Sequence, residues 1–363
     1  MISNQILQST IDGLKSITRK ELSVVEKEGK VIATTEENMI GRQIDAVENF
    51  INSPAESQLI LGYQYFKIYD NGVPEYVIQV KGEDESGYQI GKIAAFQIQS
   101  LLVAYKERYD KDNFIKNLLL DNLLLVDIYS RAKKLHIENN VHRIVYLIET
   151  HIDKEMNVVE IVRSIFPAKT KDFVTAVDEH SIILVKELKE RETADEIDRI
   201  AKTIEETLNA ETNSNVYISS GTIVSDLKDV SRSYKEAKMA LEVGKIFETE
   251  KFIVNYEKLG IGRLIYQLPL PLCRMFIKEV LHGLTMDDFD DETLATVNKF
   301  FENNLNVSET SRQLYIHRNT LVYRLDKLQK MTGLDLRNFD DAIIFKITLM
   351  VSKYMMYMDK MTY

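Results

Sequence analysis

Cysteine and long apolar runs are scarce in this chain of 363 residues. Its one cysteine, Cys273, can form neither an internal disulfide nor a zinc site with a second thiol, which excludes the disulfide-rich secreted class and predicts a reducing compartment. Lys346 and Lys353 interrupt the most apolar segment, 343–358, so no membrane span is expected. The N-terminus also lacks the basic start and apolar core of a signal peptide. We therefore expect a soluble, cytoplasmic protein without a membrane partner, with Cys273 acting as a small hydrophobe.

Catalytic and cofactor motifs are missing as well. The six histidines form no HExxH pair and no close pair with the cysteine, so no metal site is expected. Gly260-Ile261-Gly262 lacks the third glycine of a dinucleotide loop, and Ser219-Ser220-Gly221 is the end of a strand rather than a nucleophile elbow. These absences predict a protein that has no cofactor and is not an enzyme.

The net charge of -10 excludes a wholly basic nucleic-acid coat protein. It does not exclude a small DNA-binding domain in an otherwise acidic protein. The length predicts two to four domains. Residues 2–19 show helical spacing, and strands are expected at 22–26, 30–34, 58–69 and 75–81, with hairpin signals at Glu28-Gly29 and Asn71-Gly72. Residues 87–98 are predicted to be a strand running into a helix. This order predicts an α+β domain of sensor size.

Residues 94–135 have a helical pattern almost throughout. A short a/d rhythm at Ile98, Leu102, Tyr105 and Tyr109 leaves two interpretations, a helix packed on its own domain or a signalling helix that pairs two subunits. A second α/β unit follows, with strands at 142–149, 172–177, 181–185 and 215–221 and helices at 157–166, 193–209 and 230–247, in an order that resembles nucleotidyl cyclases in outline.

Residues 252–284 are expected to be a connector, because Pro269 and Pro271 bias the local backbone away from helix. The acidic run at 287–292 is interpreted as a solvated loop and helix start. Residues 292–358 are helical in pattern except for short turns.

The most informative segment is 303–329, which has the pattern of a helix-turn-helix. Ser308 is predicted to cap a short helix that ends near Leu314, and the small Ser311 would allow a second helix to cross closely. Leu314 and Ile316 can seal the turn. His317 or Asn319 can cap the next helix, which buries an apolar stripe formed by Leu321, Leu325 and Leu328.

The outward face of that second helix is predicted to carry Arg318, Thr320, Tyr323, Arg324 and Lys327. Residues 305–330 hold five Arg or Lys side chains and two carboxylates, a net charge of +3 in an acidic protein. Cationic side chains neutralise phosphates, while residues near the start of a recognition helix reach base edges. Arg318 could pair with guanine and Asn319 with adenine, with Thr320 and Tyr323 contacting phosphate or thymine methyl groups. A helical hairpin with a solvated basic face is the alternative.

The string His317-Arg318-Asn319-Thr320, with Tyr323-Arg324-Leu325 and the TGLDL sequence at 332–336, closely resembles the C-terminal helix-turn-helix of the PucR and sugar-diacid regulator (CdaR-like) family. In that family the domain binds DNA. The resemblance therefore implies DNA contacts at the matching positions, and the full predicted DNA-binding set is Ser308, Arg312, His317, Arg318, Asn319, Thr320, Tyr323, Arg324 and Lys327.

The middle of the chain resembles the same family. Segments 114–120 and 131–135 resemble its linker helix and the start of its GGDEF-like domain, and Tyr234-Lys235-Glu236-Ala237 resembles a helix of that domain. An active diguanylate cyclase has two glycines at the central hairpin, but the turn at 177–181 has none. The resemblance therefore implies a catalytically silent domain that serves coupling or dimerisation.

The N-terminal region resembles the family's sugar-diacid recognition domain, a PAS/GAF-like sensor, at 29–35 and at Ile40-Gly41. Family members carry Arg and His where this chain has Met39 and Ile44, and Arg42 lies nearby. A dicarboxylate is bound best by fixed cationic donors, so Ile40, Gly41 and Arg42 are the predicted ligand-binding residues.

We thus predict an α+β multidomain chain with a PAS/GAF-like N-terminal sensor, a degenerate GGDEF-like α/β domain and a C-terminal all-α helix-turn-helix. The expected boundaries are 1–105 for the sensor, 106–138 for a signalling or linker helix, 139–255 for the GGDEF-like domain, 256–284 for the connector and 285–363 for the DNA-binding domain.

The predicted function is a one-component transcription regulator that binds double-stranded DNA as a homodimer and responds to a small-molecule effector. A sugar diacid is the candidate effector, with carbohydrate or sugar-diacid utilisation genes as candidate targets. A signalling adaptor whose C-terminus binds protein and a nucleotide cyclase are the alternatives. The operator, and whether the protein activates or represses, stay open.

Overall fold

The computed structural model describes residues 2–70, 72–150, 158–166, 171–189, 194–212, 215–248 and 251–361. The chain divides into two compact units, residues 1–114 and 115–363. The boundary falls inside one long helix, α3 (Glu85–Leu119).

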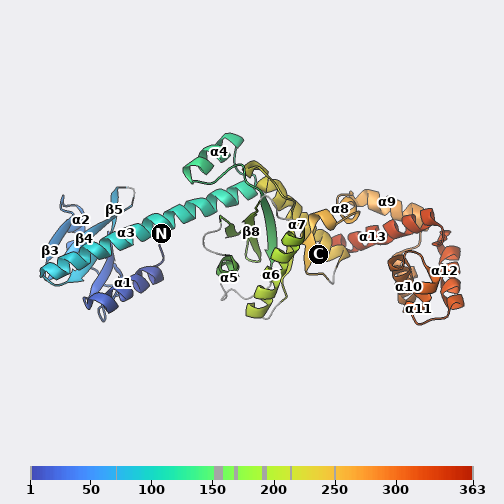
Figure 1. The fold of residues 1–363 in the computed structure, drawn as a ribbon, viewed down its shortest axis with the longest axis horizontal. Coiled ribbons are helices and arrows are strands. Elements are labelled where there is room, and N and C mark those ends of the chain that lie inside the picture. The colour runs from blue at the N-terminus through green and yellow to red at the C-terminus, as the bar shows by residue number, and fades with distance from the viewer. Residues whose placement is uncertain are drawn as a thin grey trace. The chain divides into compact units, whose positions relative to one another are not determined.

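The first unit is built on a five-stranded antiparallel sheet (Figure 1). Its elements are α1 (Asn4–Thr18), β1 (Leu22–Glu26), β2 (Val31–Thr34), α2 (Ala46–Ile51), β3 (Ser57–Ile60), β4 (Tyr63–Asp70), β5 (Val73–Lys81) and the first part of α3. The strand order is β2-β1-β5-β4-β3. Apolar residues of α1 and α3 pack on one face of the sheet, and Val47 and Phe50 of α2 pack on the other.

Two predictions for this unit are wrong. The segment expected as one strand at 58–69 forms two strands, because Leu61 and Gly62 take positive φ values of 49° and 86° and turn the chain between β3 and β4. The strand expected at the start of 87–98 is helical from Glu85 onward. Ala94 and Ile98, four residues apart, share the helix face that packs on the sheet. Asn71 of the expected Asn71-Gly72 turn lies outside the described residues.

The second unit begins with a mixed five-stranded sheet in the order β10-β9-β6-β8-β7, in which only the β9–β10 pair is parallel. Its elements are α4 (Leu125–Lys134), β6 (Arg143–Glu149), α5 (Val158–Ile165), β7 (Phe173–Ala176), β8 (Ser181–Glu187), α6 (Ala194–Thr212), β9 (Tyr217–Ser220), η1 (Leu227–Asp229), α7 (Val230–Phe247) and β10 (Ile253–Asn255). The α/β order predicted for this region is confirmed; Asn157 and Thr193, the first residues of two predicted helices, lie outside the described residues.

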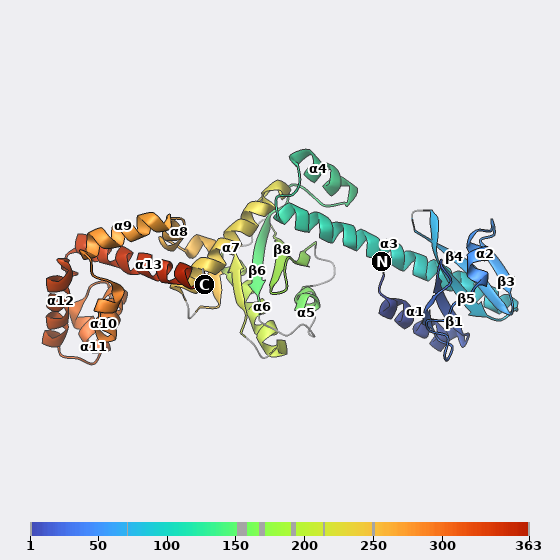
Figure 2. The same cartoon turned by 180° about the vertical axis from the view of Figure 1, so that it is seen from behind.

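Helices cover both faces of this second sheet. Apolar residues of α5 and α6 pack on the face that carries Ile144, Tyr146 and Ile148. The opposite face contacts α7, where the Ser233 hydroxyl accepts a hydrogen bond from the Val145 amide at 3.1 Å. Figure 2, the view from behind, shows α7 beside β6.

The rest of the second unit is helical. It comprises η2 (Tyr256–Lys258), α8 (Gly262–Tyr266), α9 (Leu270–Leu281), η3 (Met286–Asp288), α10 (Asp291–Glu302), α11 (Val307–Gln313), α12 (Arg318–Thr332) and α13 (Phe339–Met361). The expected connector is therefore largely helix. Pro269 is the N-cap of α9 and Pro271 lies in its first turn, where a missing N–H costs nothing because that group has no intrahelical acceptor. Cys273 of α9 is fully buried, as predicted.

Helix α13 belongs to two hydrophobic cores. Phe345 and Leu349 pack into the core that α10 and α12 share. Further along, Val351 and Tyr354 pack with Ile246 of α7 and with residues of α8 and α9. One continuous helix thus links the α/β part and the helical part of this unit. Within the described residues, no helix has both the length and the apolarity needed to cross a membrane.

Candidate nucleic-acid interface

The candidate interface is formed by helices α10, α11 and α12. Phe300 of α10 and the stripe formed by Leu321, Leu325 and Leu328 of α12 are all buried in one core. The predicted inward stripe is confirmed. Because these leucines face inward, the opposite side of α12 faces solvent.

The start of α11 differs from the prediction. The N-cap is Asn306, whose side-chain oxygen accepts a hydrogen bond from the Glu309 amide at 3.0 Å. Ser308 is exposed in the first turn rather than capping the helix. Both Asn and Ser are good N-caps, and helix ends are fixed by backbone hydrogen bonds that the sequence pattern does not reveal. Ser311 is buried, consistent with a close approach of α11 and α12.

The turn between α11 and α12 exposes an aromatic ring that the sequence analysis missed. Tyr315 has a φ of 54° and is 97% exposed, the highest value among the exposed large hydrophobic residues. The Ile316 amide donates to the Ser311 carbonyl at 3.0 Å and closes the turn. His317 is then the N-cap of α12, as one of the two predictions had it, and its Nδ1 accepts from the Asn319 amide at 3.2 Å. The sequence held one indication of this exposure, because Tyr315 lies between Leu314 and Ile316, the two apolar residues predicted to seal the turn.

The start of α12 presents its polar side chains to solvent. Arg318, Asn319 and Thr320 are exposed, and Tyr323 one turn later is 70% exposed. Lys330 continues this face toward the end of the helix. Among the described residues, no carboxylate lies within ion-pair distance of Arg318 or Lys330. Arg312 of α11 is also exposed, but its guanidinium pairs with Glu309 at 2.7 Å.

Arg324 does not lie on the free outward face as predicted. Its side chain is only 17% exposed, its Nη1 donates to the Thr296 hydroxyl of α10 at 2.9 Å, and its Nη2 pairs with Glu292. Lys327 pairs with Asp290 at 3.0 Å. The acidic run that was expected to be only solvated thus neutralises two of the basic groups of α12. The sequence pattern could not reveal these pairs, because the partners are 32 and 37 residues apart.

Asp290 is both a helix cap and an ion-pair partner. Its side chain accepts from the Thr293 amide at 2.6 Å and so caps α10, while it also binds the Lys327 ammonium. Hydrogen bonds from Thr293 and then from Lys327 hold the pKa of Asp290 well below its ordinary value. These contacts attach the start of α10 to the middle of α12.

The predicted ligand-binding residues lie on a loop at the edge of the first sheet. Ile40, Gly41 and Arg42 are all exposed, and the Gly41 amide and the Arg42 carbonyl hydrogen-bond to Val31 at 2.9 Å. Arg42 Nη1 lies 3.9 Å from the Met39 sulfur. The structure therefore places the candidate residues together but on an open surface.

A buried polar row crosses the sheet face under α2 and was missed by the sequence analysis. Ser23 of β1 pairs in register with Gln79 of β5, which pairs with Tyr65 of β4. All three are nearly fully buried, and Gln79 Nε2 donates to the Tyr65 hydroxyl at 2.8 Å. Gln79 Oε1 has no hydrogen-bond partner among the described residues. We call this set, Ser23, Gln79 and Tyr65, the polar row.

The central hairpin of the second sheet holds no phosphate-binding loop of the GGDEF type. Asp178 lies at the β7–β8 turn, and its carboxylate accepts from the amides of His180 at 2.9 Å and Ser181 at 2.7 Å. These hydrogen bonds, opposed by burial, lower the pKa of Asp178. The acidic side chain of the turn is therefore used to stabilise the turn itself.

The fold and the C-terminal geometry define a multidomain chain that ends in a helix-turn-helix. Comparison with known proteins agrees: residues 293–351 match the family model of the PucR C-terminal helix-turn-helix domain, and residues 122–243 match that of the GGDEF-like domain. These matches confirm the predicted resemblance to PucR- and CdaR-like regulators.

Relatives with established names are similar over part of the chain. The purine catabolism regulatory protein of Bacillus subtilis (strain 168) is 29% identical over 132 residues, which is 36% of this chain and 25% of that protein. The carbohydrate diacid regulator of Escherichia coli (strain K12) is 32% identical over 136 residues, or 38% of this chain and 35% of that protein. The matched part thus spans about a quarter to a third of these relatives.

Among solved structures, a regulator of polyketide synthase expression from Bifidobacterium adolescentis is similar at 15% identity over 67% of this chain and 92% of that chain. The TM-score of that pair is 0.33, which is too low to establish a common overall arrangement.

Proposed function

We propose that this protein is a DNA-binding transcription regulator whose α12 is the recognition helix. The observation that carries the proposal is the exposed start of α12 within a domain that matches the PucR C-terminal helix-turn-helix. A helix whose N-terminal side chains are free to enter the major groove is what this motif requires. The exposed Arg318 and Asn319 are suited to bidentate pairing with guanine and adenine.

The predicted DNA-binding residues divide into three groups by their positions and contacts. Arg318, Asn319, Thr320 and Tyr323 form the proposed base- and phosphate-contacting face, which Lys330 and Tyr315 extend. Ser308, Arg312 and His317 lie beside it and are proposed as phosphate-proximal positions at the helix ends. Arg324 and Lys327 are instead proposed to hold α12 against α10, because their charges pair with Glu292 and Asp290 at the start of α10.

We further propose that the N-terminal unit binds a small-molecule effector under α2, at the polar row. A buried amide oxygen without a partner costs free energy, which a ligand donor at that place would recover. The name of the Escherichia coli relative makes a sugar diacid the first candidate, and a hydroxyl group of such a ligand could donate a hydrogen bond to Gln79 Oε1. The exposed Arg42 is the nearest match to the family's ligand-binding segment.

A homodimer is proposed because α3 exposes large apolar side chains to solvent. Ile93, Phe96 and Val103 lie on one face of the helix and are each more than half exposed. Such a stripe is a common way for two helices to pair, and two-fold pairing would let two α12 helices read two half-sites.

The GGDEF-like domain is proposed to serve structure rather than catalysis. Its central turn lacks the glycines that let a backbone approach nucleotide phosphates, and Asp178 is occupied by turn amides. Incubation of the protein with GTP and Mg²⁺ tests this directly. Formation of a cyclic nucleotide would overturn the proposal.

Selection of DNA from a genomic library by the full-length protein, at two salt concentrations, tests the main proposal. An enriched two-fold-symmetric motif, whose binding weakens with salt, is expected for the protein and for Lys360→Ala but not for Arg318→Ala. If no DNA is enriched in any condition, the protein is not a DNA-binding regulator. In that case a partner captured equally by wild type and Arg318→Ala would favour the signalling adaptor.

A further inference from the structure

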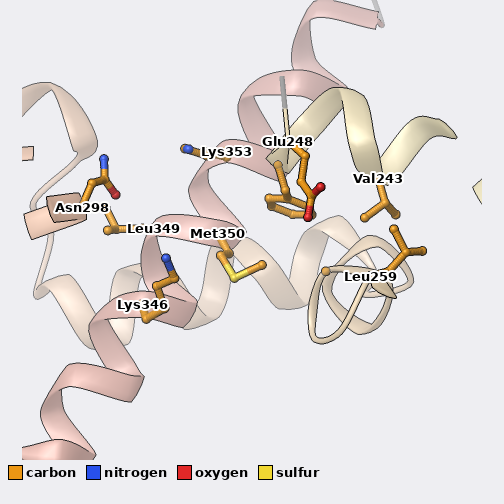
Figure 3. Close-up of a pocket in the computed structure, with 10 residues that line it drawn as sticks. Val243, Glu248, Leu259, Asn298, Lys346, Leu349, Met350 and Lys353 are labelled. Atoms are coloured by element: carbon orange, nitrogen blue, oxygen red, sulfur yellow. The ribbon is translucent and has the colours of Figure 1, made fainter. Parts of the chain in front are cut away.

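The second unit contains a cavity of about 200 Å³ where the α/β part meets the helical part. Its lining comes from four places in the chain: α7 and the residue after it, the segment from η2 to α8, α10 and α13. Figure 3 shows these side chains converging, with those of α13 in the centre. Among the lining residues are Val243, Phe247, Leu259, Asn298, Lys346, Met350 and Lys353.

One side of the cavity is cationic. Lys346 and Lys353 lie seven residues apart on α13, two helical turns, so that both project from the same face. Asn298 of α10 adds an amide beside them (Figure 3). Among the described residues, neither ammonium has a carboxylate within ion-pair distance. Two unpaired positive charges next to an amide donor form a site that an anion would neutralise.

The surroundings of Lys346 support this assignment. Its Nζ lies 5.1 Å from the centre of the Phe301 ring, which positions the ammonium. Partial burial, and then the positive charge of Lys353, lower the pKa of Lys346 below its ordinary value. An anion between the two lysines would remove this repulsion.

The other side of the cavity is apolar. Val243 and Phe247 of α7 and Leu259 line it. In the view of Figure 3, Met350 lies between Lys346 and Leu259. Glu248 also lines the cavity, but its carboxylate pairs with Lys251 at 2.8 Å. An anionic group is therefore favoured at the lysine side and an apolar group at the α7 side. The volume lies below the roughly 300–1,000 Å³ of most ligand sites, which limits the occupant to a small molecule.

We propose that this cavity, which we call the junction cavity, binds a small organic acid, with its carboxylate between Lys346, Lys353 and Asn298 and its apolar body against Val243, Phe247 and Leu259. The ligand would touch both α7 and the helix that belongs to two cores. This site is separate from the effector site proposed for the N-terminal unit, and its occupancy does not depend on DNA binding.

Benzoate is a suitable probe, because it joins one carboxylate to one apolar ring. Its binding to the full-length protein is measured by ligand-observed NMR, beside its neutral analogue benzamide and the small anion acetate. Benzoate is expected to bind more tightly than both. Because each ammonium would donate a charge-assisted hydrogen bond to the carboxylate, loss of each lysine is expected to weaken benzoate binding about tenfold or more.

The variant Lys346→Met/Lys353→Met removes both positive charges of the cavity while keeping side chains of similar length. The variant Lys346→Arg/Lys353→Arg keeps the charges. Lys360→Met, an exposed lysine of the same helix that does not line the cavity, is the matched control. Benzoate should bind the wild type, the arginine variant and the control, but not the methionine variant. No benzoate binding at millimolar concentration would overturn the proposal. So would equal binding of benzoate and benzamide, equal binding of benzoate and acetate, or no change in the methionine variant.

Discussion

Arg324→Ala is the substitution that best separates a DNA contact from a structural contact. The change removes the hydrogen bond to Thr296 and the ion pair with Glu292, both of which join α12 to α10. The guanidinium is largely shielded from water, so its hydrogen bonds fall in the class worth about 1.5–3 kcal/mol. We expect a loss of about 2 kcal/mol in the free energy of unfolding of the second unit. For a unit of this size, that corresponds to a midpoint of thermal unfolding lower by roughly 4–8 °C.

The matched variant is Arg318→Ala. Arg318 is exposed and has no ion-pair partner among the described residues, so its removal should change the free energy of unfolding by less than about 0.5 kcal/mol. It should instead weaken DNA binding by about 1–3 kcal/mol and relax the preference for guanine at one position of the binding site. Thermal unfolding followed by circular dichroism and DNA titrations at several salt concentrations measure both quantities on the full-length protein.

An exchange of behaviour between the two variants would contradict these assignments. An unchanged unfolding midpoint for Arg324→Ala, together with a salt slope (the slope of log K against log salt) reduced by about one, would mean that Arg324 leaves Glu292 to bind a phosphate. Glu292→Gln provides an independent check. If Arg324 is structural, this variant lowers the unfolding midpoint slightly and leaves the salt slope unchanged.

Three further predictions concern the two parts of the second unit. Leu325→Ala opens a cavity in the buried stripe and should cost about 2–5 kcal/mol in thermal unfolding, with loss of DNA binding; a change below about 1 kcal/mol would contradict the packing. Gly221→Ala would place a methyl group 2.0 Å from the Ser233 carbonyl oxygen, so we expect the sheet to lose its packing on α7. This loss would be measured as a lower midpoint of thermal unfolding and a weaker near-ultraviolet circular dichroism signal. A native spectrum would show that α7 can shift freely. The folded-state pKa of Asp290 is lowered from 3.8, so its stabilisation is present above that value and is lost as the pH falls below it. Below about pH 4, the unfolding midpoint of the wild type should therefore fall more steeply than that of Asp290→Asn. Parallel curves would mean that the contacts of Asp290 do not stabilise the fold.

Most of the local structure could be predicted from the amino-acid sequence alone. The buried stripe of Leu321, Leu325 and Leu328 follows from the helical period, and the strand at β6 follows from a run of Val and Ile residues, because both patterns depend only on neighbouring residues. The family resemblance was also readable, since it rests on a contiguous string around His317. The mistakes fell at turns and helix ends, such as Leu61-Gly62 and Ser308, where a single backbone angle decides the outcome.

The contacts between residues far apart in the sequence are visible only in the three-dimensional fold. It brought the acidic run of α10 onto Arg324, aligned Ser23, Gln79 and Tyr65 across three strands, and joined two lysines of α13 with apolar residues of α7 in the junction cavity. None of these pairs has a periodic signal, because the chain between the partners can have any length and the contact is set by how whole elements pack. Exposure of a charged side chain, and hence its freedom to bind DNA, is therefore a property of the packed domain rather than of the helix that carries it.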